Sequence, residues 1–106
     1  MRTSDAVIPP AAASDETATA QVVLAFDDNR LASILFGQYG QNLALIERRL
    51  GVVAEQRGNH VTVDGSRNGC EQARRVLEGL YEQIKRDHDL TQGDVEGAIR
   101  QAIAQG

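Results

Sequence analysis

Two glycines three positions apart, Gly37 and Gly40, are the residues whose type and spacing are best suited to chemistry. A glycine has no Cβ, so a ligand can approach its backbone closely and the chain can adopt positive φ. Apolar residues at helical spacing precede and follow the pair, which predicts that residues 37–40 join two short helices. Backbone N–H groups at the start of the second helix can then bind a phosphate. The alternative is a tight turn in which the glycines only cap the helices.

Other residue types that carry chemistry are sparse. Cys70 falls on an apolar helical stripe and no histidine is placed to activate it, so we expect a small core residue rather than a nucleophile. His60 and His88 are far apart in sequence, and Asp27 and Asp28 precede a helix, where carboxylates act as caps. We therefore expect no metal site, no cofactor and no enzymatic activity. The chain also lacks a Gly-x-x-x-x-Gly-Lys-Ser/Thr segment, so no residue is expected to hold ATP.

The composition predicts one globular domain. Among 106 residues, 42% are apolar, only 4% are aromatic and tryptophan is absent, so the core must be aliphatic. The net charge of −4 argues against unspecific coating of nucleic acid. Residues 30 to 75, however, include seven arginines and four carboxylates, so this segment is basic. Residues 76 to 106 include three basic residues and six carboxylates, so that segment is acidic. The middle of the chain is thus able to attract a polyanion, unless its arginines are merely solvated.

The sequence also predicts where the protein resides. No apolar run approaches the length of a membrane span, and the first residues lack the apolar stretch of a signal peptide, so no membrane partner is expected. One cysteine excludes an intrachain disulfide. The cytoplasm is therefore the expected compartment.

The position of the glycine loop depends on the elements around it. Short β-branched runs predict strands, and apolar residues three and four positions apart predict helices. Prolines, alanines and acidic residues with little to bury predict a disordered tail over residues 1–20. The expected elements are a strand 21–26, a helix 30–36, the loop, a helix 41–50, strands 52–57 and 60–64, a long helix 68–86, and a last helix from 92.

Turn and cap residues mark the ends of these elements. Residues 58–59 are Gly-Asn and predict a two-residue hairpin turn. Asn68 with Glu71 resembles a capping box for the long helix, and Thr91 with Asp94 is expected to cap the last one. The predicted core consists of Leu24 or Val23, Leu31, Ile34, Leu43, Ile46, Val61, Val63, Ala73, Leu77 and Leu80.

The order strand, helix, Gly-x-x-Gly, helix, strand, strand, helix resembles that of a eukaryotic-type KH domain. The resemblance implies an α+β fold of KH-like βααββα order, a three-stranded sheet with helices packed on one face, plus an extra C-terminal helix. It also implies a ligand groove between the two short helices and the strand that begins at Val52.

The spacing of several segments resembles the N-terminal region of PhoH-family (phosphate starvation-inducible-type) proteins, where a KH-like segment precedes a P-loop ATPase domain. The resemblance covers about residues 21–105 and is carried by residues 29–51, 57–60, 80–81 and 90–100. The ATPase half is missing. We therefore expect a disordered tail 1–20, a KH-like domain 21–88, and an appended helix 89–106 that leads toward an absent ATPase domain.

The resemblance implies binding of single-stranded RNA or DNA. KH loops usually carry a lysine or arginine between the glycines, whereas this loop has Gln38 and Tyr39. Tyr39 either stacks on a base or covers the core. The site implied by the resemblance consists of Gly37, Gln38, Tyr39 and Gly40 on the sugar-phosphate backbone, Leu35, Leu43 and Val53 under the bases, and Arg48, Arg49 or Arg57 at the rim.

The alternative function is a protein-interaction or regulatory module that docks on the PhoH ATPase domain or another partner and binds no nucleic acid. The acidic net charge and the uncharged loop favour it. The last helix favours it too, because its apolar stripe needs a surface to cover it. That stripe is predicted to consist of Val95, Ala98, Ile99, Ala102 and Ile103.

Overall fold

A computed structural model describes residues 19–86 and 89–105 of the chain. Their fold is α+β, and the predicted order of elements is confirmed. The predicted tail falls outside the described residues up to position 18, and Thr19 and Ala20 belong to the first strand instead. The elements are β1 (Thr19–Ala25), α1 (Asn29–Phe36), the 3₁₀ turn η2 (Gln38–Gly40), α2 (Gln41–Leu50), β2 (Val53–Arg57), β3 (His60–Ser66), α3 (Arg67–Lys85) and α4 (Gln92–Gln105).

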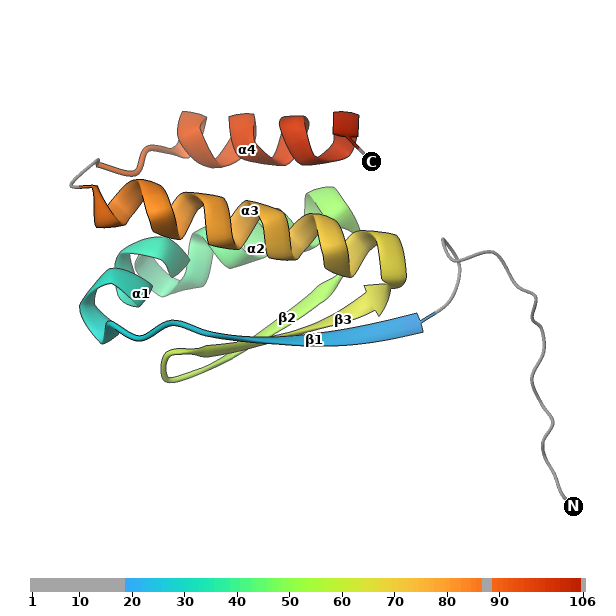
Figure 1. Cartoon of the computed structure of the whole chain (residues 1–106), viewed down its shortest axis with the longest axis horizontal. Helices are drawn as coiled ribbons and strands as arrows, with labels where there is room; N and C mark the ends of the chain where they lie inside the picture. Colours follow the sequence, from blue (N-terminus) through green and yellow to red (C-terminus); the bar gives the residue numbers. More distant parts are fainter. Residues whose placement is uncertain (1–18, 87–88, 106) are drawn as a thin grey trace, which may run out of the picture.

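The three strands form one antiparallel sheet with β3 in the middle, in the order β1-β3-β2. Side chains alternate between the two faces of each strand. Val61 and Val63 are therefore buried under the helices, whereas Thr62 and Asp64 lie on the opposite, open face. Figure 1 shows all four α-helices on the same side of the sheet. The predicted arrangement of helices on one face is confirmed.

The core lies between the sheet and α1, α2 and α3, with α4 as an outer layer (Figure 1). Most of the predicted core is buried, but Val23 and Ile34 are exposed and Leu31 is only half-buried. On α1 the buried face carries Ala32, Leu35 and Phe36. The confirmed core positions are Leu24, Leu43, Ile46, Val61, Val63, Ala73, Leu77 and Leu80.

Side chains cap three of the four α-helices. The Asp28 carboxylate accepts bonds from two N–H groups of the first turn of α1. Thr91 and Asp94 cap the start of α4 as predicted, and they do so as a reciprocal box with bonds of 3.0 and 3.1 Å. The box predicted for α3 is wrong. Because β3 runs directly into α3, Ser66 is the cap and its hydroxyl accepts from the Gly69 N–H at 2.9 Å.

Helix α4 packs on α3 and α2 of the same chain. Val95, Ile99 and Ala102 are buried in this contact, whereas Ile103 from the predicted stripe is exposed. The apolar stripe of α4 thus finds its covering surface within this chain. In the described residues, no helix combines the length and the apolar character needed to cross a membrane.

Candidate functional site

The glycine loop is a tight turn that ends α1 and begins α2. The Gly37 N–H donates to the Ser33 carbonyl at 3.1 Å and closes α1, and the Gly40 N–H donates to the Gly37 carbonyl at 3.0 Å. Three of its residues have positive φ: +82° at Gly37, +57° at Tyr39 and +71° at Gly40. Glycine adopts such angles without steric cost, so the conformation of the turn itself favours both glycines.

Asn42 fixes the conformation of the loop from below. Its side-chain amide donates to the Leu35 carbonyl at 3.0 Å, and the side chain is buried. A Cβ on Gly37 would lie 2.9 Å from Asn42 Nδ2, so the glycine also makes room for this anchor. Sequence reasoning missed Asn42. The sequence signal that could have identified Asn42 is a polar residue directly before the buried Leu43 in the first turn of a helix.

Among the exposed large hydrophobic residues of the described chain, Tyr39 has the highest exposure, with 98% of its surface accessible. Such exposure excludes the possibility that the ring covers the core. Its φ of +57° lies in the left-handed region, which costs a non-glycine residue about 1–2 kcal/mol. The loop therefore holds an aromatic ring in solvent in an unfavourable backbone conformation, next to the start of α2.

Helix α2 differs from the other α-helices because no side chain caps its first turn. Its N-cap is Gly40, and the Gln41 N–H already donates to the Gln38 carbonyl, so the first-turn donors without a side-chain cap are those of the residues after Gln41. The positive end of the helix dipole adds to these donors, so an anion is favoured there. The loop and the first turn of α2 together present backbone donors beside an exposed ring.

Arg48 and Arg49 lie in the last turn of the same helix and are exposed. Neither forms an ion pair within the described part of the chain. Arg48 also lines a hollow of about 200 Å³ between α2 and the first residue of α4, together with Gln41 and Gln92. With a rise of about 1.5 Å per residue, Arg48 is roughly 10 Å along the helix from Gln41.

The predicted apolar platform for bases is wrong. Leu35 has no accessible surface and Leu43 is buried, because both belong to the core under the loop. Val53 is 62% exposed, but it pairs with Asp64 and therefore points to the open face of the sheet, away from the helices. Arg57 lies on the same open face.

On its α2 side, the groove expected between the two short helices and the strand that begins at Val52 is bridged by a hydrogen bond. The Glu47 carboxylate accepts a bond from the Ala54 N–H at 2.7 Å and ties α2 to β2. Arg57 at the far end of β2 forms an exposed ion pair with Glu55 at 3.3 Å. Only the loop and α2 therefore keep the geometry that the resemblance implied.

Residues with reactive side chains lie apart from the loop. Cys70 is buried as predicted, and burial, followed by the charge of Asp64, raises the pKa of its thiol. Its Sγ donates to the Ala20 and Val63 carbonyls at 3.5 Å. His60 is exposed on β3, and His88 lies outside the described residues. Across residues 19–86 and 89–105, no three residues of the metal-ligating types come together.

No protein-family model matches the chain, and no curated protein is significantly similar to it. Its fold is similar to the crystal structure of a protein of unknown function from Aeropyrum pernix. The TM-score is 0.65 at 16% sequence identity, over 82% of this chain and 48% of the other. This chain thus spans about half the length of the Aeropyrum pernix protein. At that identity the likeness shows a shared fold, and the PhoH resemblance stays a prediction.

Proposed function

We propose that this chain is a single-stranded RNA-binding module whose contact surface is the loop 37–40 and the first turn of α2. The observation that carries the proposal is the pairing of an uncapped helix start with the fully exposed ring of Tyr39. Backbone donors suit the phosphates of a nucleic acid, and an exposed aromatic ring suits its bases. A helix turn that served only to connect α1 and α2 has no need to hold a tyrosine at positive φ.

Each group of the loop contacts a different part of the RNA. The first-turn N–H groups of α2 bind one phosphate, and the Tyr39 ring stacks on a neighbouring base. The amide of Gln38 offers both a donor and an acceptor to the sugar or base edge. Arg48 and Arg49 supply the positive charge that the loop lacks. Asn42 and the two glycines keep the loop in one conformation, so less entropy is lost on binding.

The order of elements supports the same proposal, since a βααββα unit with Gly-x-x-Gly between its first two helices is that of KH modules. The PhoH resemblance adds that such a module works beside an ATPase domain in a longer protein, with the ATP chemistry outside this chain. We accordingly assign the chain a binding role rather than an enzymatic one. We also propose the cytoplasm as its compartment.

The proposal is tested by changing the ring and the hydroxyl of Tyr39 separately. Asparagine tolerates positive φ, so Tyr39→Asn removes the ring with little added strain. Affinity for a mixed single-stranded RNA pool, about ten nucleotides long so as to exceed a four-nucleotide KH footprint, should fall about 5- to 150-fold. Tyr39→Phe keeps the ring and should stay within about twofold, since stacking needs only the aromatic face. Equal affinity of all three proteins would remove Tyr39 from the site.

Docking on a protein partner is the second candidate, favoured by the net charge of −4 and by the absence of lysine or arginine between the glycines. The same titration separates the two candidates. A protein-docking module should show no saturable RNA binding at physiological salt, either in the native chain or in the Tyr39 variants.

A further inference from the structure

The free edge of β1 exposes backbone groups without partners in the described residues. The Phe26 N–H donates to the Asn59 carbonyl at 2.9 Å, and in an antiparallel ladder the groups that face the partner strand alternate along the chain. The N–H and C=O groups of Gln21, Val23 and Ala25 therefore point away from β3. No side chain in the described part of the chain bonds to them, so the seven-residue strand can accept another strand.

The opposite edge of the sheet is less open to an added strand. β2 is shorter, and its outward Ala54 N–H is already bonded to the Glu47 carboxylate at 2.7 Å. The next residues form the exposed Glu55–Arg57 ion pair, and charged side chains discourage strand addition. The protection of one edge and the openness of the other make β1 the edge at which a strand can be added.

A hollow of about 610 Å³ accompanies the open edge. Residues 23–27 of the chain form one wall, and Glu78, Tyr81, Glu82 and Lys85 of α3 form the other. The added strand would lie between the edge of β1 and the side of α3, a geometry in which main-chain bonds give affinity and side-chain pockets give specificity.

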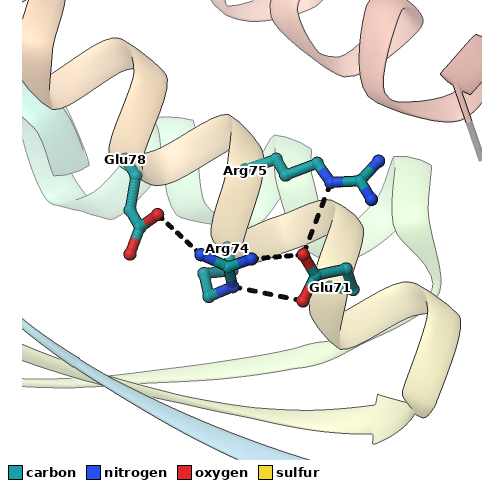
Figure 2. A network of polar contacts seen from close by, with 4 residues as sticks. All are labelled: Glu71, Arg74, Arg75 and Glu78. Atoms are coloured by element: carbon teal, nitrogen blue, oxygen red, sulfur yellow. Dashed lines mark hydrogen bonds and ion pairs between the residues drawn. The ribbon is translucent and has the colours of Figure 1, made fainter.

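The acidic side chains that line this hollow favour a basic ligand. Three carboxylates, from Asp27, Glu78 and Glu82, line it against one ammonium group from Lys85. Glu78 is bound by Arg74 at 2.8 Å, and Figure 2 shows this pair on the side of α3 that faces the strands. Lys85 in turn forms an ion pair with Glu82 at 3.3 Å. Both pairs are solvent-exposed and weak, so basic side chains of an incoming strand can exchange with them.

Two other occupants fit the charge less well. The chain's own segment 1–18 carries three carboxylates and one arginine, so it is acidic like the hollow. A second copy joined edge to edge would bring the Glu78 and Glu82 side chains of the two α3 helices toward each other. Like charges placed together are destabilising.

We propose that the β1 edge, with the side of α3 beside it, binds an extended basic peptide segment of another protein by strand addition. This site lies apart from the loop 37–40 and does not depend on the RNA-binding proposal.

The probe is a synthetic seven-residue peptide in which lysine alternates with valine, matched to the length of β1. Amide NMR shifts of the full chain should change at Gln21, Val23 and Ala25 and along α3 from Glu78 to Lys85. The same peptide with alternate backbone nitrogens methylated keeps its charge and loses edge hydrogen bonds. It should bind at least about tenfold more weakly, and a glutamate-for-lysine peptide should not bind.

Protein variants test the contribution of the β1 edge and that of the acidic side chains of α3 separately. Val23→Pro removes one outward N–H and no ladder bond, so it should weaken peptide binding about 3- to 10-fold while the fold survives. Glu78→Gln with Glu82→Gln should weaken binding about 5- to 10-fold through lost charge attraction. The control Glu55→Gln, on the β2 edge, should leave peptide binding unchanged.

The proposal is overturned if the methylated and unmethylated peptides bind equally, or if the shifts map to β2 or to the loop. Sedimentation of the chain without peptide gives a second check that does not depend on any variant. A monomer supports the proposal. Concentration-dependent dimers with shifts at the β1 amides would show that a second copy is the occupant and contradict it.

Discussion

The Tyr81 hydroxyl of α3 donates a hydrogen bond to the Asp27 carboxylate at 2.7 Å and accepts one from the Asp28 N–H at 3.1 Å. A buried phenol thus joins the long helix to the segment that begins α1. The bond lowers the pKa of Asp27, and burial, followed by the Asp27 bond, raises the pKa of Tyr81. The contact couples the stability of the fold to pH at both ends of the scale.

The sign of each effect follows from the form that the fold prefers. The carboxylate of Asp27 is preferred, so its contribution is present above about pH 4 and is lost as the pH falls through the lowered pKa. The neutral phenol of Tyr81 is preferred, so its contribution is present below about pH 10 and is lost as the pH rises through the raised pKa. Tyr81→Phe should lower the melting temperature at neutral pH and flatten both slopes.

Thermal melting from acid to alkaline pH checks this prediction, with Tyr39→Phe as the control. The hydroxyl of Tyr39 is in solvent, so its removal should change neither the melting temperature nor its pH dependence. A Tyr81→Phe protein with unchanged pH dependence would show that the bond contributes nothing.

Two neighbours on α1 test the orientation of that helix. Leu35 has no accessible surface, whereas Ile34 is 48% exposed. Leu35→Ala should therefore cost about 2–5 kcal/mol, and Ile34→Ala should cost less than about 1 kcal/mol. Urea unfolding measures both values. Equal costs, or the reverse order, would restore the sequence-based assignment of Ile34 to the core.

Replacing either of two glycines by alanine should change the stability of the fold in opposite directions, although both glycines have open space around them. Gly40 has φ of +71°, so Gly40→Ala should destabilise the fold by about 1 kcal/mol through backbone strain. Gly79 lies inside α3 with an ordinary φ, and Gly79→Ala should stabilise it by about 0.5–1 kcal/mol. Chemical denaturation of both variants measures the difference. Stabilisation by Gly40→Ala would mean that the loop is not held at positive φ.

The salt dependence of RNA binding tests the phosphate contact at the loop. Gln38→Lys places a positive charge between the glycines and should strengthen binding. It should steepen the log–log salt dependence by about 0.7, as for one added phosphate contact on a single strand. Gln101→Lys makes the same change of charge on the exposed side of α4 and should leave the slope unaltered. Equal slopes in the two variants would place the phosphate elsewhere.

The order of the elements followed from the sequence because periodicity and turn residues are local signals. The hairpin turn and the Thr91–Asp94 cap were predicted for the same reason. The cap at Ser66 was not predicted, because it depends on β3 continuing into α3 without a loop. Local patterns cannot show that two elements join directly.

The site was less predictable than the fold because it depends on which way side chains turn in three dimensions. Leu35 and Val53 are apolar residues of the kind on which bases can stack. Leu35, however, is turned into the core, and Val53 is turned to the open face of the sheet. The Glu47–Ala54 bond and the Asn42 anchor join segments whose contact no periodicity reveals. The two glycines of the loop were predictable because positive φ restricts residue type.

The most direct test of the RNA-binding proposal is an amide NMR titration of the full chain with the single-stranded RNA pool. We expect saturable shifts that are largest at the Gln38 and Tyr39 amides and in the first turn of α2, with smaller changes near Arg48. No change at these amides, or changes confined to the β1 edge and α3, would contradict it.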